Sequence, residues 1–298
     1  SDVCSSDLLD DAATDLTTLS VSGTSNLGAN VTTTGNQTYT GAVTLSGGDR
    51  TLTGSTVNFV STLAGGTNAL TVTGNLDLDD AATGLSTLDV SGTSNLGANV
   101  TTSSTQTYTG AVTLSGGDRT LTGSTVNFVD TVTGNTTHDL TITGNLDLDG
   151  AMTDVVELSV SGTSNLGADV TTSSTQTYTG AVTISTDGVT LTTTNSQITF
   201  SSTVNSEASE ANALNISVGS SEVEFDGVIG GGTNGSLGAI TITGALDLDA
   251  ALTSATSLSV STTSDLGANV TTSSTQTYTG AVTLSGGDRT DRKSTRLN

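Results

Sequence analysis

The 298-residue sequence has no proline and no tryptophan, a single cysteine, and only six lysine and arginine residues. One cysteine excludes a disulfide framework within the chain. No window approaches the roughly 18 apolar residues that a membrane-spanning helix needs. Aromatic residues make up 3% of the chain and apolar residues 33%, which is low for a compact domain of this length. These absences favour a fold that needs only a thin core.

Acidic residues greatly outnumber basic ones, with 29 Asp and Glu against 6 Lys and Arg and a formal net charge of −23. A field of this sign repels nucleic acid and anionic lipid. We therefore expect no nucleic-acid binding and no membrane insertion by this segment. The charge also favours solubility of a long particle, which we expect to be a monomeric rod.

The two ends of the chain differ from its interior. Back-translation of the tail, DRKSTRLN, gives a DNA word whose reverse complement encodes SDVCSSD and the start of a Leu codon, as at the beginning of the chain. The word resembles a sequencing-library adapter, and the internal repeats stop matching at the same two places. We expect residues 1–8 and 291–298 to be adapter-derived scars. The natural segment, 9–290, is then a fragment with no cysteine and no lysine.

A long repeat runs through the natural segment. The motif SGTSNLGANVTT begins at residue 22 and again at 91, with close variants beginning at 161 and 261, so the offsets are 69, 70 and 100 residues. Such a period is typical of repeat architectures. The predicted modules are 19–87, 88–157, 158–257 with an insert at about 207–236, and a partial module at 258–290.

Each module contains a shorter, degenerate period of about 17 residues in which apolar and polar residues alternate, as at Leu70, Val72, Leu76 and Leu78. Alternation of this kind is typical of β-strands, and no stretch has a sustained helical stripe. A unit this short cannot bury its own apolar face, whereas stacked coils can. The sequence therefore predicts an all-β fold, a β-solenoid of about 16 coils and on the order of 75–80 Å in length at the usual strand spacing. We expect four coils in a module of about 70 residues, and the insert to form one or two added coils. Tandem β-sandwich domains are the alternative, although they need about 100 residues each and usually a large core aromatic.

Lines such as QTYTGAVTLSGGDRTLTGSTVNFVSTLAGGTNALTVTG at 37–74 resemble the β-strand repeats of filamentous-haemagglutinin-like adhesins and autotransporter passengers of Gram-negative bacteria. The resemblance covers essentially all of 9–290. It implies a right-handed parallel β-helix, secretion across the outer membrane, and an extracellular location at the bacterial cell surface. It also implies adhesion or biofilm roles, with a surface glycan or protein of a host or neighbouring cell as the partner.

From these features we expect a non-catalytic structural shaft of a secreted adhesin rather than an enzyme, with no cofactor. His138 is the only histidine, and no second His or Cys accompanies it to build a metal site of the usual kind. Nor does the chain offer a catalytic triad to include it. His138 is therefore expected to lie in a surface turn.

A recurrent acidic motif supplies the only metal candidates. If Leu76 and Leu78 point inward, Asp77 and Asp79 point outward. Calcium needs six to eight oxygens, so we expect a solvated face, with weak polyvalent binding of calcium or glycans as the alternative. The weak calcium candidates are Asp77, Asp79, Asp147, Asp149, Asp247 and Asp249.

Two further interpretations remain open. The insert carries a singular acidic stretch that includes Glu222 and Glu224, which could serve a polysaccharide-active β-helix enzyme or a partner-binding bulge. No Arg, Lys or His accompanies it to bind a sugar, so catalysis is the weaker alternative. Threonine pairs such as Thr71 and Thr73 could order water on an ice-binding face, but their β-propensity explains them more simply.

Asparagine recurs at fixed places in the modules, where we expect equivalent turns with side chains that cap backbone groups. These residues are Asn26, Asn95, Asn165, Asn30, Asn99 and Asn269.

Overall fold

The computed structural model describes residues 2–4, 7–9, 11–232, 235–285 and 291–293. Over these ranges the chain consists of β-strands and turns, without a helix. The chain divides into two compact units, unit 1 (Ser1–Asn145) and unit 2 (Leu146–Asn298). The predicted all-β fold is confirmed, and each unit is described by itself.

Most strands of unit 1 are short, and successive strands are joined by turns. They are β1 (Asp2–Cys4), β2 (Asp7–Leu9), β3 (Ala13–Leu16), β4 (Leu19–Val21), β5 (Ser25–Leu27), β6 (Val31–Thr33), β7 (Gln37–Tyr39), β8 (Val43–Leu45), β9 (Arg50–Phe59), β10 (Leu63–Ala64), β11 (Leu70–Leu78), β12 (Ala82–Leu85), β13 (Leu88–Val90), β14 (Ser94–Leu96), β15 (Val100–Thr102), β16 (Thr105–Tyr108), β17 (Val112–Leu114), β18 (Arg119–Phe128) and β19 (Val132–Thr133).

Strand β20 (Leu140–Leu148) begins in unit 1 and ends in unit 2. The remaining strands of unit 2 are β21 (Met152–Val155), β22 (Leu158–Val160), β23 (Ser164–Leu166), β24 (Val170–Thr172), β25 (Gln176–Tyr178), β26 (Val182–Ile184), β27 (Val189–Thr192), β28 (Ile198–Phe200), β29 (Val204–Ser206), β30 (Leu214–Phe225), β31 (Leu237–Leu248), β32 (Leu252–Val260), β33 (Ser264–Leu266), β34 (Val270–Thr272), β35 (Gln276–Tyr278), β36 (Val282–Leu284) and β37 (Asp291–Lys293).

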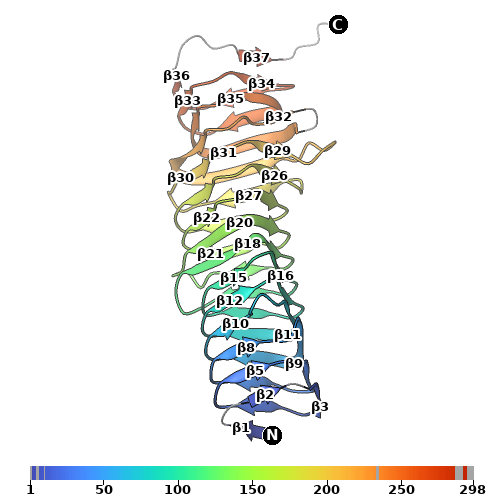
Figure 1. Cartoon of the computed structure of the whole chain (residues 1–298). Helices are drawn as coiled ribbons and strands as arrows, with labels where there is room; N and C mark the ends of the chain where they lie inside the picture. Colours follow the sequence, from blue (N-terminus) through green and yellow to red (C-terminus); the bar gives the residue numbers. More distant parts are fainter. Residues whose placement is uncertain (1, 5–6, 10, 233–234, 286–290, 294–298) are drawn as a thin grey trace. The chain divides into compact units, whose positions relative to one another are not determined.

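In unit 1 the strands stack into three parallel ladders, each of which forms one face of a β-solenoid. One ladder runs from β5 through β8, β10 and β12 to β15, and Figure 1 shows these strands stacked in that order. A second runs through β4, β7, β9, β11, β14 and β17, and a third through β3, β6, β9, β11, β13 and β16. Strands β9 and β11 are long enough to bend from the third face onto the second. The predicted β-solenoid is therefore confirmed.

The coils are longer than the period of about 17 residues that the sequence predicts. Ladder partners lie 18 residues apart at Ala82 and Val100, and 21 residues apart at Val31 and Leu52. The difference arises in turns such as SGGDR, whose glycines at 47 and 48 have positive φ and lie outside the strands. A module of 69 or 70 residues therefore holds fewer than the four coils that we expect from the sequence.

Unit 2 accommodates the predicted insert as one additional coil. In unit 1 the ladder takes four steps from Ser25 to Val100, through β8, β10 and β12. In unit 2 it takes five steps from Ser164 to Val270, through β26, β29, Ile229 and β32. The extra step is the coil that contains Ile229, which confirms the prediction of one or two added coils. Residues 233 and 234 of the insert lie outside the described residues.

Strand alternation places apolar side chains inside each coil. Leu76 and Leu78 are 3% and 1% exposed, so Asp77 between them faces outward, as predicted. Aromatic rings stack between neighbouring coils, with Tyr39 and Phe59 5.4 Å apart between centroids. Stacking of this kind adds to the stabilisation from burial alone.

A buried polar network, not foreseen from the sequence, accompanies each stacked tyrosine. Gln106 is fully buried, and its Oε1 accepts a hydrogen bond of 2.9 Å from the Tyr108 hydroxyl. Its Nε2 donates to the backbone oxygens of Thr122 (2.8 Å) and Val100 (3.2 Å). Gln37 and the other equivalents repeat this arrangement. One feature of the sequence could have predicted this network. In QTY, strand alternation places the Gln on the same inward side as the Tyr two residues later.

Two of the three arginines within residues 9–290 hydrogen-bond to backbone carbonyls at or near turns. The Arg50 guanidinium donates to the backbone oxygens of Leu27 (2.9 Å), Asp49 (2.7 Å) and Ser46. Arg119 donates to the Ser115 oxygen, and burial lowers its pKa. Arg289 lies outside the described residues.

The predicted end scars lie partly within the described backbone. Strand β1 pairs with β4, and β37 pairs with β34. Backbone pairing requires no particular side chain, so these pairings leave the origin of residues 1–8 and 291–298 a prediction.

The repeat of the sequence and the turn of the coil are out of phase. In unit 1 the SNL motif at 25–27 lies on the ladder of β8 and β10, whereas the copy at 94–96 lies between β11 and β17 on another face. In unit 2 the copy at 164–166 pairs with β26, whereas the SDL variant at 264–266 pairs with β31 and β36. A module of 69 or 70 residues is not a whole number of coils. Equivalent motifs within a unit therefore lie on different faces.

We predict that Gln106→Ala destabilises unit 1 by about 2–3 kcal/mol, because the change leaves a cavity and removes the acceptor of the buried Tyr108 hydroxyl. Gln276 is the matched control, because it lies in the same QTYTGAVT sequence but is only partly buried. The Gln276→Ala change should cost about 1 kcal/mol or less. Midpoints of urea unfolding, followed by circular dichroism, measure both. Equal losses for the two variants would contradict the role assigned to the buried network.

Candidate functional site

A gathering of acidic side chains lies on one face of unit 2. Burial of Val223 and Phe225 on β30, and of Leu246 and Leu248 on β31, turns the residues between them outward. Glu224, Asp247 and Asp265 consequently occupy successive rungs of one outward column. We call these three residues, with Glu222, Asp226 and Asp249, the acidic face.

Hydrogen bonds hold one end of the acidic face. Gln197 Nε2 donates to Glu224 Oε2 at 3.0 Å and to Glu222 Oε1 at 3.4 Å. The Thr199 hydroxyl also donates to Glu224 Oε2, at 3.2 Å. Glu224 is therefore anchored to the preceding coil rather than projecting into solvent.

Three carboxylates of the acidic face converge. Oxygens of Glu224, Asp226 and Asp249 lie within 4.8 Å of one another, and Asp226 and Asp249 are exposed. One oxygen from each residue supplies half or less of the six to eight that calcium takes. The arrangement could hold a cation only with several waters.

The electrostatics of the acidic face are uniformly negative. Burial, followed by the charges of Asp249, Glu222, Asp265 and Glu224, raises the pKa of Asp247 above its ordinary value. The sequence contains no Lys, Arg or His between His138 and Arg289. No cation from this stretch therefore offsets the carboxylates.

The first two acidic motifs are built differently. Asn95 Nδ2 donates to Asp77 Oδ1 at 2.8 Å, and Asn165 Nδ2 donates to Asp147 Oδ1 at 2.9 Å. Burial and the neighbouring Asp77 raise the pKa of Asp79.

Asp149 behaves like Asp79, with burial and then Asp147 raising its pKa. In unit 2, Asp147 lies on the ladder of β23, whereas Asp247 lies on that of β33. The structure thus brings Asp247 and Asp249 together with the acids of the insert and leaves the earlier motif of unit 2 on another face. A polyvalent line of acidic motifs does not form within unit 2.

The asparagine predictions divide into two groups. Asn30 and Asn99 cap backbone groups as expected, since their Oδ1 atoms accept from the amides of Thr51 and Thr120, each at 2.9 Å. Asn269 occupies the same position immediately before β34. The turn assignment is wrong for the others, Asn26, Asn95 and Asn165. These residues lie at the centres of strands, because the Ser and Leu on either side are buried.

His138 lies in the turn before β20, partly buried, with Thr137 as its hydrogen-bonding neighbour at 3.4 Å. The threonine pair at 71 and 73 matches a second pair at 51 and 53 on the preceding coil. On the following coil Asp89 stands beside Thr71, so the hydroxyl array is interrupted after two coils. Neither feature assembles a site.

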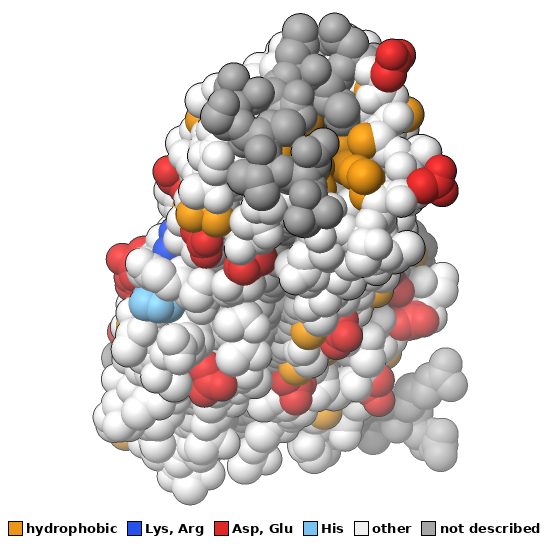
Figure 2. Space-filling view, turned by 90° about the horizontal axis from the view of Figure 1, so that it is seen from below, with side chains coloured by type: hydrophobic (Ala, Val, Ile, Leu, Met, Phe, Trp, Pro, Cys, Tyr) orange, Lys and Arg blue, Asp and Glu red, His pale blue; other side chains and the backbone are white. Residues whose placement is uncertain are grey.

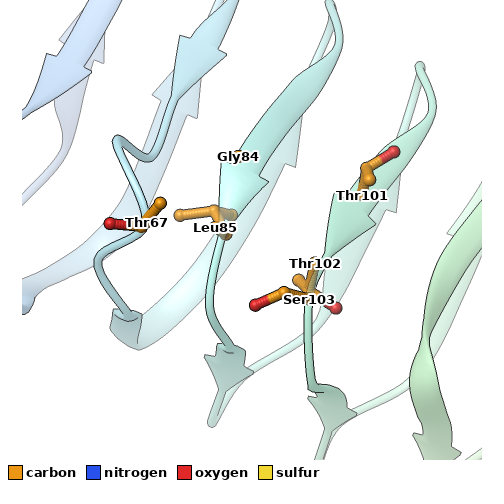
Figure 3. Close-up of a pocket in the computed structure, with 6 residues that line it drawn as sticks. All are labelled: Thr67, Gly84, Leu85, Thr101, Thr102 and Ser103. Atoms are coloured by element: carbon orange, nitrogen blue, oxygen red, sulfur yellow. The ribbon is translucent and has the colours of Figure 1, made fainter.

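A shallow hollow of about 180 Å³ opens on unit 1. Figure 3 shows its lining residues on consecutive coils, with Thr67 on one, Leu85 on the next, and Thr102 and Ser103 on the third. Its volume is below the roughly 300 Å³ at which small-molecule sites begin, and no ionisable side chain lines it.

Figure 2 shows Asp and Glu side chains spread among uncharged ones. In the described part of the chain, no helix has the length and hydrophobicity to cross a membrane.

Searches against protein-family models, curated proteins and solved structures yield no match to this chain.

Proposed function

We propose that this chain is the non-catalytic shaft of a secreted adhesin at the bacterial cell surface, where it mediates adhesion or biofilm contacts. The observation that carries the proposal is the stacking of successive coils by parallel backbone pairing within each unit. A repeat of this kind adds coils without requiring new contacts elsewhere. Extension is thus the property that its architecture serves best.

The surface supports the same proposal. Carboxylates face outward, and the Arg50 and Arg119 side chains are engaged with backbone carbonyls. Outward charges discourage lateral pairing of strands between molecules. A shaft needs this protection more than it needs a pocket, and the hollow on unit 1 is too small to serve as a typical binding cleft.

The partner we propose is a glycan or protein on the surface of a host or neighbouring cell. Polyvalent binding of calcium or glycans is disfavoured, because the acidic motifs of unit 2 lie on different faces. A polysaccharide-active enzyme is disfavoured, because Glu222 and Glu224 have no cationic neighbour in the sequence between 139 and 288.

If the chain is a shaft, deletion of the module 88–157 should shorten the particle and leave its cross-section unchanged. The expected loss is on the order of 15–20 Å, from fewer than four coils at about 4.8 Å each. Small-angle scattering of the full chain and of the deletion variant measures both quantities. A compact particle, or a deletion that changes the cross-section instead, would overturn the proposal.

A shaft should also bind calcium no more tightly than about 1 mM, the weak end of extracellular sites. Calorimetric titration of the full chain tests this. Saturable tighter binding that is lost on Asp249→Asn, with Asp89→Asn as the control outside the acidic face, would favour the cation-binding alternative. Turnover of a polysaccharide, abolished by changing Glu222 and Glu224, would favour the enzyme.

A further inference from the structure

The sequence contains seven copies of the pattern Asn-x-Ser/Thr, the acceptor pattern for N-linked glycosylation when x is not proline. Because the chain has no proline, none of the copies is excluded on that ground. The asparagines are Asn30, Asn36, Asn99, Asn135, Asn215, Asn234 and Asn269. Asn234 lies outside the described residues, so the structure bears on the other six.

Transfer of a sugar to asparagine requires access to the whole side-chain amide. The amide nitrogen is a weak nucleophile, because its lone pair is delocalised into the carbonyl group. A transferase must therefore enclose the amide together with the hydroxyl group two residues later. An amide that is bonded to a neighbouring coil, in a pattern whose central residue is buried, cannot be enclosed in this way while the coil stays folded.

Five of the six asparagines lie in or immediately before strands that pair between coils, and we call them the wall asparagines: Asn30, Asn36, Asn99, Asn215 and Asn269. The central residues of their patterns are each 3% exposed or less, namely Val31, Gln37, Val100, Ile216 and Val270. Asn30 Oδ1, for example, accepts a hydrogen bond of 2.9 Å from the amide of Thr51 on the next coil. The side-chain amides of Asn36, Asn99 and Asn215 also bond to neighbouring coils.

Asn135 differs from the wall asparagines in its accessibility. It lies in the turn between β19 and β20, and Asn135, Thr136 and Thr137 are all exposed. The Thr137 hydroxyl donates to the backbone oxygen of Asn135 at 3.4 Å, within the same turn. The Asn135 side-chain amide makes no hydrogen bond to any described residue. The complete acceptor pattern is therefore open to a second protein without any loss of pairing between coils.

The turn does not need an asparagine at position 135. The corresponding turn of the first module has Gly66 at this position, and φ is 58° at both residues. The following residues, Thr67 and Thr136, also share a positive φ. Glycine makes the same backbone turn, so the Asn135 side chain is not required for folding.

We propose that Asn135 is an acceptor site for N-linked glycosylation of the folded chain. In the reaction Asn135 Nδ2 forms a bond to C1 of a sugar carried by a glycosyl pyrophosphate donor. The bond between C1 and the pyrophosphate oxygen breaks, and the pyrophosphate leaves with the electron pair. Nδ2 loses one proton to a base of the transferase. The modification goes beyond the proposed shaft function and does not depend on it.

Incubation of the folded full chain with a soluble N-glycosyltransferase that accepts Asn-x-Ser/Thr, and with UDP-glucose as the donor, tests the proposal. Mass spectrometry of peptides from an acid-residue-specific protease should find glucose on Asn135 in most molecules. Occupancy of the wall asparagines should be at least about tenfold lower, because each needs local opening of its coil. Synthetic peptides 96–103 and 132–139 should be modified at similar rates, which would assign the difference to the fold.

Substitutions in the turn separate recognition of the pattern from general exposure. Thr137→Ala should abolish transfer to Asn135, whereas Thr137→Ser should retain it, because the hydroxyl is the recognised group. Thr136→Ala is the matched control, since it removes the neighbouring exposed hydroxyl and should leave transfer unchanged. Unfolding midpoints should confirm that all three variants fold.

Three results would overturn the proposal. One is an unmodified Asn135 in the folded chain when the peptide 132–139 is modified. Another is equal transfer to Asn99 and Asn135 in the folded chain, which would show that the turn offers no advantage. The third is a peptide 132–139 that stays unmodified when the peptide 96–103 accepts glucose.

Discussion

Parallel pairing of each coil with the next is the constraint on which the rest of the structure depends. Each rung forces alternate residues to opposite sides of the wall, so the buried Leu76 and Leu78 determine that Asp77 is outside. The same pairing stacks Tyr39 on Phe59 and brings the Gln106 amide to the carbonyls of neighbouring strands. Positions on the surface are thus set by packing beneath them, and the acidic face is a consequence of the core that turns it outward.

Much of the architecture follows from local alternation. The β-solenoid, the absence of helix over the described ranges and the extra coil of the insert could all be derived from residues such as Leu70 and Val72 and from repeat offsets. The coil length could not, because glycine-rich turns such as that at 47–48 contribute residues that belong to no strand. The strand position of Asn26 was not predicted, because Ser25 beside it is small and polar and gives no sign in the sequence that it is buried.

The candidate site was less predictable than the fold. The outward direction of Asp77 needs only strand periodicity, but the meeting of Asp249 with Asp226 and Glu224 depends on coil length. Which residues far apart in the sequence lie side by side can be predicted only when the number of residues per coil is known. The contrast between Asn165 and Asp265 was legible in the repeats. The strand register is needed to show that Asn165 lies beside Asp147 and that Asp265 lies beside Asp247.

The mismatch between repeat and coil bears on how such a chain can evolve. Tandem modules with closely similar sequences can expand and contract by unequal recombination. In a solenoid whose module was a whole number of turns, every duplication would copy the same patch onto the same side and lengthen a stripe. Here the two SNL copies of unit 1 face different directions, so a duplicated module brings its polar decoration to a new side. The length of the solenoid can therefore change without placing the same residues in one continuous stripe that could promote aggregation.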